Sequence, residues 1–297
     1  MHTPDWPYPR WIAHRGAGRL APENTLAAFR LGAKFGYRMF ECDVKLSADG
    51  VPFLLHDATL TRTTNASKVQ PAPADTAPAA INAIAKPAEE APQSSTGDPS
   101  GPLTEASPGS LAGNVAEALA GNLPWSRLCQ LDAGSWHSAP FAGEPLPTLA
   151  HVAAFCLTGG HLLNIEIKPS PGTGRHTGEV VAQHAARLWA GQRVPPLLTS
   201  FDVPALEGAL ACEPALPRGL LLAELGPYWL ETALRLECCA VVCQYRLWDA
   251  TTVALAKAAG LRTLSYTVND TESVNRLIAL NTDGIITDRV DVFAPAR

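Results

Sequence analysis

Three acidic residues stand in two apolar runs of the chain, and their spacing is suited to a cation site. Side chains alternate between the two faces of a strand, so Glu41 and Asp43 share one face, and Glu166 shares a face with Lys168. A carboxylate is costly to bury unless it is paired or binds a cation. Three such oxygen donors suit Mg²⁺ or Ca²⁺, with Mn²⁺ as a further candidate. The alternative is a set of ion pairs, from Glu166 to Lys168 or Lys45.

Two histidines lie on either side of this carboxylate pair in the sequence. His14 follows the apolar run 11–13 and precedes Arg15, and His56 follows the apolar run 51–55. Imidazole titrates near neutral pH and suits general acid or base catalysis. A guanidinium binds phosphate through a planar set of donors. A single histidine at a strand end is more often structural than catalytic, but the combination predicts phosphoryl transfer.

Short motifs along nearly the whole chain resemble the glycerophosphodiester phosphodiesterase family. Each motif is weak alone, but their order and spacing together are specific. The motifs are His14-Arg15-Gly16, Pro22-Glu23-Asn24-Thr25, Glu41-Cys42-Asp43, His56-Asp57, Thr61-Arg62-Thr63-Thr64, Ala133-Gly134-Ser135-Trp136, Pro147-Thr148-Leu149, Asn164-Ile165-Glu166-Ile167-Lys168, Ser200-Phe201, Tyr266-Thr267-Val268-Asn269 and Asp283-Gly284-Ile285-Ile286-Thr287-Asp288. Two further stretches, 6–10 and 217–222, are most similar to the bacterial cytosolic members.

The resemblance implies a metal-dependent hydrolase that splits glycerophosphodiesters, such as glycerophosphocholine or glycerophosphoethanolamine, into sn-glycerol 3-phosphate and an alcohol. Carried onto this chain, it implies three metal ligands, two phosphate-binding cations, two acid–base histidines and three aromatic residues of the substrate pocket: Glu41, Asp43 and Glu166; Arg15 and Lys168; His14 and His56; Trp136, Phe201 and Tyr266. The preferred assignment makes His14 the base and His56 the acid, with the reverse as the alternative. Asp57 either orients His56 or caps a turn, and the turn is preferred. The nucleophile, water or the glycerol 2-hydroxyl, stays open.

Two other functions are compatible with the same motifs. One is a lysophospholipase D-type phosphodiesterase on the same fold, which needs an exposed apolar entrance that the sequence does not display. The other is a non-enzymatic glycerophosphodiester-binding protein. Such a protein is expected to lack a histidine or a carboxylate of the site, and this chain keeps them all.

Composition and charge narrow the class of protein. The chain has 297 residues, is 46% hydrophobic and carries a net charge of -5, which disfavours binding to nucleic acid or an anionic membrane. No apolar run reaches the roughly 18 to 20 residues of a membrane span. Seven cysteines without a regular framework, and no secretory signal, predict reduced thiols and a cytoplasmic location. The cluster Cys238, Cys239 and Cys243 is not interpreted as a metal site. It lacks a paired Cys-x-x-Cys motif, and the apolar residues 240–242 within it predict a buried strand. The oligomeric state stays open.

Alternating strand and helix signals predict a TIM-type (β/α)8 barrel, with an open doubly wound sheet as the alternative. In such barrels, catalytic groups lie at the carboxyl ends of the strands. Barrel strands are expected at 11–14, 39–46, 161–168, 197–201, 219–222, 240–243, 262–268 and 284–287. Helices are expected to open at 22–25 and end at Gly36, to begin near 148, to span 178–189, to begin at 204, and to span 228–236, 249–259 and 271–280.

One region interrupts this alternation. Residues 68–113 are rich in Pro, Ala, Ser and Gly, and no aromatic residue occurs between Phe53 and Trp125. Such a composition predicts a disordered insert, within a cap at 58–145 of a single domain spanning 1–297. Removing these 46 residues from 297 leaves 251, close to the roughly 250 of this barrel. A surface loop is the preferred interpretation, and a lid or docking segment is the alternative.

Overall fold

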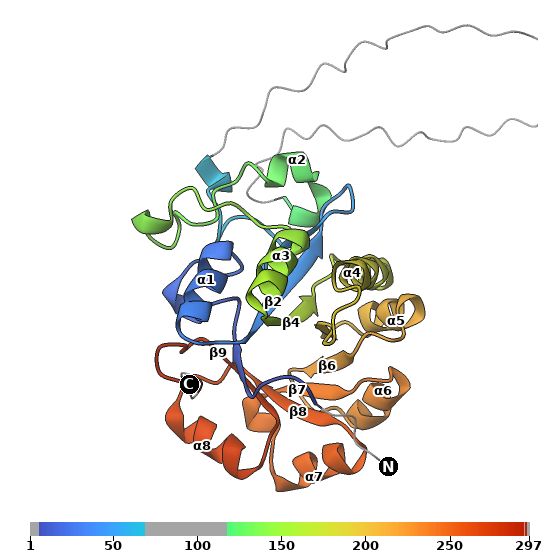
Figure 1. Ribbon diagram of the computed structural model, residues 1–297. Coiled ribbons are helices and arrows are strands. Elements are labelled where there is room, and N and C mark those ends of the chain that lie inside the picture. The colour runs from blue at the N-terminus through green and yellow to red at the C-terminus, as the bar shows by residue number, and fades with distance from the viewer. Residues whose placement is uncertain (1–5, 69–117, 294, 296–297) are drawn as a thin grey trace, which may run out of the picture.

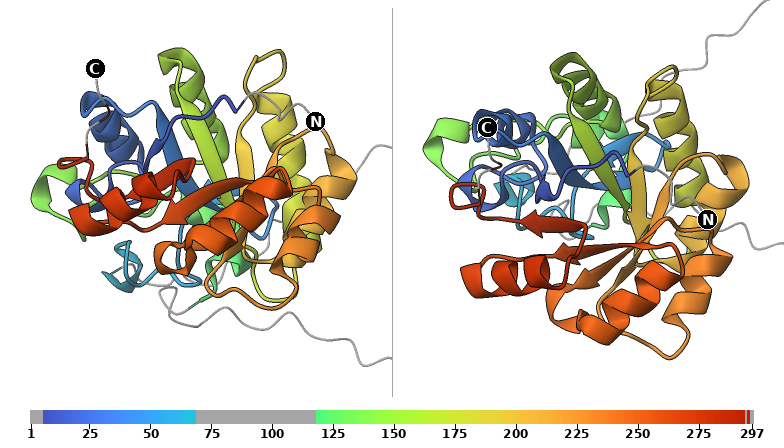
Figure 2. Two further views of the ribbon diagram at one scale, coloured as in Figure 1. Left: turned by 90° about the horizontal axis from the view of Figure 1, so that it is seen from below. Right: turned by 60° about the horizontal axis from the view of Figure 1, so that its bottom comes forward.

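A closed barrel of parallel strands forms the centre of the computed structural model, which describes residues 6–68, 118–293 and 295. Within these residues, nine strands form one sheet in the order β1-β9-β8-β7-β6-β5-β4-β2-β3, and a pairing of β1 with β2 closes it. Eight strands pair in parallel, while β3 is antiparallel to β2. The helices lie outside the strands (Figure 2). The predicted barrel is confirmed, because the β1–β2 pairing excludes an open sheet.

The observed elements lie close to the predicted ones. The strands are β1 (Trp11–Ala13), β2 (Met39–Leu46), β3 (Pro52–Leu54), β4 (Leu162–Ile167), β5 (Leu197–Ser200), β6 (Arg218–Leu222), β7 (Ala240–Gln244), β8 (Arg262–Tyr266) and β9 (Gly284–Thr287). The helices are α1 (Leu26–Lys34), α2 (Trp125–Leu128), α3 (Leu149–Gly159), α4 (Gly174–Leu188), α5 (Val203–Cys212), α6 (Trp229–Arg235), α7 (Ala250–Ala258) and α8 (Thr271–Ala279).

Side-chain caps begin many of these helices. Thr25, Thr148, Asp202, Asp249 and Asp270 each accept a hydrogen bond from a backbone N–H of the first turn that follows. These bonds satisfy donors that have no partner within the helix. The polar residues between the apolar runs therefore fix where the helices start.

The start of α4 is the clearest difference from prediction. The helix begins at Gly174, not at 178. Gly178 does not mark a helix terminus; it lies where α4 contacts α5, and a Cβ there would collide with the carbonyl of Ala205. The glycine is needed for close packing of two helices, which a sequence pattern does not distinguish from a helix boundary.

Two apolar layers orient the side chains of β2. Met39 lies in the cluster that fills the barrel, together with Ile12 and Leu264, and Tyr8 belongs to the same cluster. Phe40 belongs to the other cluster, between sheet and helices. Because residues alternate along the strand, Glu41, Asp43 and Lys45 share the inward face of Met39. The strand therefore directs charged side chains to the mouth of the barrel, next to the apolar cluster that fills its interior.

A cap covers one end of the barrel, above β2 and α3 in Figure 1. Its apolar cluster includes Phe53, Leu60, Leu128 and Leu146. Glu144 Oε1 accepts a hydrogen bond of 2.9 Å from the backbone N–H of Ala27 in α1, which ties the cap to the barrel. The predicted insert 68–113 lies outside the described residues apart from residue 68, and the boundaries 58–145 stay a prediction. No helix in the described ranges is long and apolar enough to cross a membrane.

Candidate active site

The three carboxylates predicted to bind metal come together at the mouth of the barrel. β2 and β4 pair in a register that places Asp43 beside Glu166, and Glu41 beside Asn164. One oxygen from each of the three acidic residues lies within 4.8 Å of the others. Asp43 is 0% exposed and Glu41 3%. Parallel pairing of two strands with the predicted alternation is therefore enough to assemble the cluster.

The hydrogen bonding of this cluster tests whether a cation fits it. Glu41 Oε1 and Asp43 Oδ1 are buried and accept no hydrogen bond from the described residues, and Glu166 Oε1 has only the ion pair with Lys168. Burial and the neighbouring Asp43 raise the pKa of Glu41 to about 8, and the same two causes raise the pKa of Glu166. Buried carboxylate oxygens without donors suit a hard divalent cation, so the residues present fit one.

Two cations flank the carboxylates. Arg15 Nε lies 3.0 Å from Asp43 Oδ2, and the backbone N–H of Arg15 donates to Glu41 Oε2 at 3.0 Å. Lys168 Nζ lies 2.8 Å from Glu166 Oε1 and 3.5 Å from Asp43 Oδ1. Burial alone would raise the pKa of Asp43, but Arg15 and Lys168 outweigh it and lower that pKa. The ion-pair alternative is thus correct for Glu166 and Lys168, without excluding a cation.

His14 is held by a second carboxylate from the far end of the chain. Its Nδ1 lies 2.6 Å from Asp288 Oδ1, and Asn269 Nδ2 donates to the other oxygen of Asp288 at 2.8 Å. Its Nε2 lies 3.8 Å from Glu41 Oε2. Burial lowers the pKa of His14, but Asp288 and Glu41 outweigh burial and raise it. The imidazole therefore points from Asp288 toward the carboxylate cluster.

His56, like His14, is held by a carboxylate at its Nδ1 atom. Its Nδ1 lies 2.7 Å from Asp57 Oδ1. Arg62 donates to both oxygens of Asp57, at 2.6 and 2.9 Å. The preference for Asp57 as a turn cap is therefore wrong, because its side chain orients the histidine. Burial is the main cause that lowers the pKa of His56.

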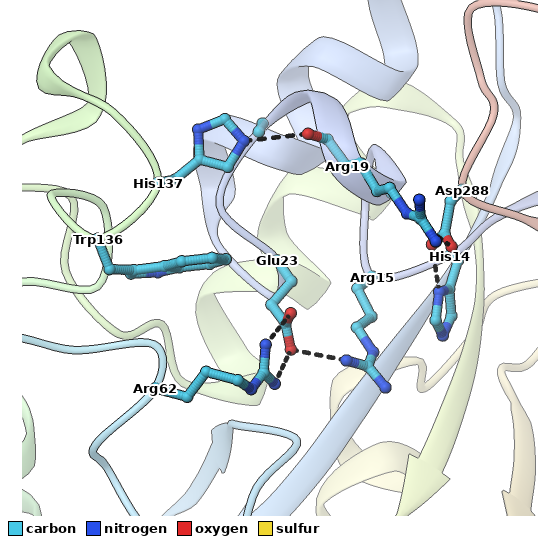
Figure 3. Close-up of a pocket in the computed structure, with 10 residues that line it drawn as sticks. His14, Arg15, Arg19, Glu23, Arg62, Trp136, His137 and Asp288 are labelled. Carbon is cyan, nitrogen blue, oxygen red and sulfur yellow. Dashed lines mark hydrogen bonds and ion pairs between the residues drawn. The ribbon is translucent and has the colours of Figure 1, made fainter.

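A chain of ion pairs links the two halves of the site, and sequence reasoning missed it. Arg62 donates to Glu23 at 2.7 and 2.8 Å, and Arg15 Nη1 donates to Glu23 Oε1 at 2.7 Å. Figure 3 shows both guanidinium groups directed at Glu23. Glu23 and Arg62 could have been noted as candidates, because both are charged residues within the family motifs of the sequence. Their shared contact depends on the folding of the cap onto the barrel.

Backbone strain accompanies two residues of the site. Arg15 and Asn24 have φ values of 48° and 59°. This left-handed region is energetically unfavourable for residues that carry a side chain. Asn24 Nδ2 donates to Asp43 Oδ2 at 2.8 Å, and its Oδ1 accepts from the N–H of Asp43 at 3.1 Å. Thr25 caps α1, and the Asn24 side chain instead forms these two hydrogen bonds with Asp43.

The three predicted aromatic residues of the substrate pocket lie in two separate places around the carboxylate cluster. Trp136 borders a cavity of about 300 Å³ between cap and barrel, which His14, Arg15, Glu23 and Arg62 also line (Figure 3). Phe201 and Tyr266 do not line this cavity; they contact each other edge to face, 5.6 Å apart. Lys168 Nζ lies 5.9 Å from the centre of the Phe201 ring.

Comparisons with known proteins agree with this geometry. The family model described as "Glycerophosphoryl diester phosphodiesterase family" matches residues 14–292. A phosphodiesterase of Oleispira antarctica, solved in complex with the product sn-glycerol-3-phosphate, has a TM-score of 0.72 and 29% identity, covering 94% of this chain and 93% of its own. A glycerophosphodiester phosphodiesterase of Caldanaerobacter subterraneus is 28% identical over 282 residues, 93% of each chain.

Some similar proteins match only in part. A glycerophosphoinositol inositolphosphodiesterase of Mus musculus is 55% identical over 65 residues, and its human counterpart matches over the same length. These matches span only 12% of each relative. The family model, in contrast, spans residues 14–292, which contain every candidate site residue and the barrel strands that follow β1. The chain therefore belongs to the glycerophosphoryl diester phosphodiesterase family.

Proposed function

We propose that this protein hydrolyses glycerophosphodiesters to sn-glycerol 3-phosphate and an alcohol. The observation that carries the proposal is the cluster of Glu41, Asp43 and Glu166, with oxygens within 4.8 Å of one another, beside Arg15 and Lys168. An anionic phosphodiester needs cations to offset the charge that grows toward the transition state. The product bound to the Oleispira antarctica phosphodiesterase supports sn-glycerol 3-phosphate as the product here.

The carboxylates Glu41, Asp43 and Glu166 would hold the divalent cation, with Mg²⁺, Ca²⁺ and Mn²⁺ as candidates. When bound, it supplies Lewis-acid polarisation of a phosphate oxygen. Arg15 and Lys168 neutralise the remaining phosphate charge, since both point into the cluster from loops that follow barrel strands. Trp136 on one wall, and Phe201 and Tyr266 on the other, line the substrate pocket in this proposal.

The histidines divide the proton transfers. His14 acts as base, because its Nε2 faces the carboxylate cluster while Asp288 holds its Nδ1. His56, oriented by Asp57, protonates the leaving alkoxide. The pKa directions alone favour the reverse, since the pKa of His14 is raised and that of His56 lowered. Part of the rise at His14 comes from the charge of Glu41, which diminishes once that carboxylate is a ligand.

One assay tests this function against its alternatives. Metal-depleted protein is given glycerophosphocholine or lysophosphatidylcholine, and Mg²⁺, Mn²⁺ or Ca²⁺ is restored in turn. We expect metal-dependent release of sn-glycerol 3-phosphate from glycerophosphocholine. Release of choline from lysophosphatidylcholine alone would favour the lysophospholipase D alternative. Binding without turnover on either substrate would favour the non-enzymatic alternative.

The remaining proposals concern location and substrate size. All seven cysteines lie in the described ranges and are free thiols, which supports the proposed cytoplasmic location. The cavity of about 300 Å³ beside Arg15 suits a small-molecule substrate. Fractionation of cells and a comparison of glycerophosphodiesters with different alcohols would test both.

A further inference from the structure

Lys45 is a charged residue of the barrel mouth that has no assigned role. It lies on β2, on the inward face that also carries Glu41 and Asp43, and its Cα pairs with that of Phe53 across the β2–β3 ladder. Only 5% of the residue is exposed. The strand that supplies two candidate metal ligands therefore also directs a lysine into the same space.

This lysine differs from the other cations of the site. Arg15 and Lys168 each form an ion pair with a carboxylate of the cluster. Lys45 forms no ion pair and no side-chain hydrogen bond with any described residue. Its place on the strand still puts it at the site, because Asp43 lies two residues earlier on the same face of β2 and pairs with Glu166 of β4.

The Lys45 side chain is largely removed from water, and its ammonium has no ion-pair or hydrogen-bonding partner among the described residues, an arrangement that costs free energy of folding. A side chain of similar length and no charge, such as Met, would fill the same space without that cost. The position therefore carries a group that folding disfavours, which is characteristic of residues retained for function. The partner that such a group lacks is an oxygen anion.

We propose that Lys45 is a third phosphate-binding residue, whose Nζ donates a hydrogen bond to an oxygen of the substrate phosphodiester. This proposal rests on the proposed function of the same site. It gives the phosphate three cations from three positions in the barrel: Arg15 after β1, Lys45 on β2 and Lys168 after β4. Unlike Arg15 and Lys168, Lys45 has no ion-pair partner within residues 6–68 and 118–293, so its donors can turn to the ligand.

The test compares Lys45→Met with the parent protein under saturating Mg²⁺. We expect kcat/KM for glycerophosphocholine, and the affinity for sn-glycerol 3-phosphate measured by calorimetry, to fall by about 10- to 100-fold, the worth of a hydrogen bond to a charged group. We expect the melting temperature to stay the same or rise. Lys45→Arg should recover part of the loss. The matched control is Lys34→Met, an exposed lysine of α1 outside the site, which should leave every value unchanged.

A role limited to balancing the charge of the carboxylates gives a different result. Removing a nearby positive charge should then strengthen Mg²⁺ binding and leave the affinity for sn-glycerol 3-phosphate unchanged, which would overturn the proposal. A lower melting temperature together with lower activity, in Lys45→Met and in Lys45→Gln, would indicate structural support and also overturn it.

The two proposals fail in different ways. If the parent protein binds sn-glycerol 3-phosphate but hydrolyses no glycerophosphodiester, the proposed function is wrong, and the calorimetric comparison still tests Lys45. If the parent is active and Lys45→Met matches it in kcat/KM and product affinity, Lys45 has no part in binding phosphate, and the proposed function stands.

Discussion

Paired charges hold most of the side chains of this site in place. Asp288 holds His14, Asp57 holds His56, and Glu23 lies between Arg15 and Arg62. In each case a carboxylate orients a group that is proposed to act on the substrate, which reduces the entropy lost on binding. The carboxylates of the cluster are different, because Glu41 Oε1 and Asp43 Oδ1 accept no hydrogen bond from the described residues.

The carboxylates are tested by removing one charge. Glu166→Gln should lower divalent-cation affinity and activity by at least the roughly 10- to 100-fold typical of changes around a metal site, because a negatively charged ligand becomes a neutral one. Calorimetry with Mg²⁺ and an assay of product release measure the two effects. Glu179→Gln is the control, because Glu179 is only partly buried and pairs with Arg175 on α4, away from the site. Full activity of the parent in excess chelator would refute the metal site itself.

The histidines are tested through the leaving group. His56→Ala should lower kcat by roughly 10²- to 10⁴-fold on glycerophosphocholine. If His56 protonates the leaving alkoxide, the loss should shrink for a substrate that releases p-nitrophenolate, which needs no proton. His14→Ala should lose activity on both substrates alike. An equal loss in His56→Ala on both substrates would support the reversed assignment.

Among the secondary-structure elements, β2 and the cap each contribute side chains to the site and to the ion pairs around it. β2 supplies Glu41, Asp43 and Lys45 on one face, because alternate residues point into the barrel. The cap supplies Arg62, which bonds to Asp57 and, across to the loop after β1, to Glu23. Docking of the cap therefore sets the positions of His56 and Arg15 together.

This coupling predicts the effect of Arg62→Ala. Both Asp57 and Glu23 lose their shared donor, so activity should fall by roughly 10- to 100-fold, as for residues that orient metal-site groups. Stability should fall by only about 1 kcal/mol, since Arg62 is half exposed. Kinetics and thermal unfolding measure the two effects. Arg235→Ala removes a comparable arginine–glutamate pair, with Glu207, and should leave activity unchanged. Equal behaviour of both variants would refute the coupling.

For the whole molecule, the buried carboxylates link stability to pH and to cations. Burial and Asp43 raise the pKa of Glu41 from 4.5 to about 8. The folded chain therefore keeps a proton that the unfolded chain releases, and the free energy of unfolding falls as pH rises through this window. The raised pKa of His14 acts in the same direction. Asp43, whose pKa is lowered, acts at lower pH than this window.

We therefore expect chelator-treated protein to melt at a lower temperature at about pH 8 than at about pH 5.5, and Mg²⁺ to raise the melting temperature more at the higher pH. Glu41→Gln should remove much of this pH dependence, because glutamine does not titrate. Scanning calorimetry at the two pH values measures it. A stabilisation by Mg²⁺ that is the same at both values would contradict the raised pKa of Glu41.

The sequence by itself determined the local order of this protein. Period-two alternation placed Glu41 and Asp43 on one face of their strand and Glu166 and Lys168 on one face of another. Apolar runs located the strands within a few residues, because both signals depend on neighbours along the chain. The alternation of strands and helices then restricted the fold to a barrel or an open sheet. The resemblance to the family predicted which histidines and which positively charged residues belong to the site.

Only the tertiary structure decided which of these groups touch. Asp288 lies 274 residues from His14, and Arg62 lies 39 residues from Glu23. Such contacts depend on barrel closure and on how the cap docks, which no local pattern encodes. The same is true of Lys45, whose lack of an ion-pair partner among the described residues follows from where their other charges lie. Polar partners separated in sequence are fixed by register and packing, and so they appear only in the folded chain.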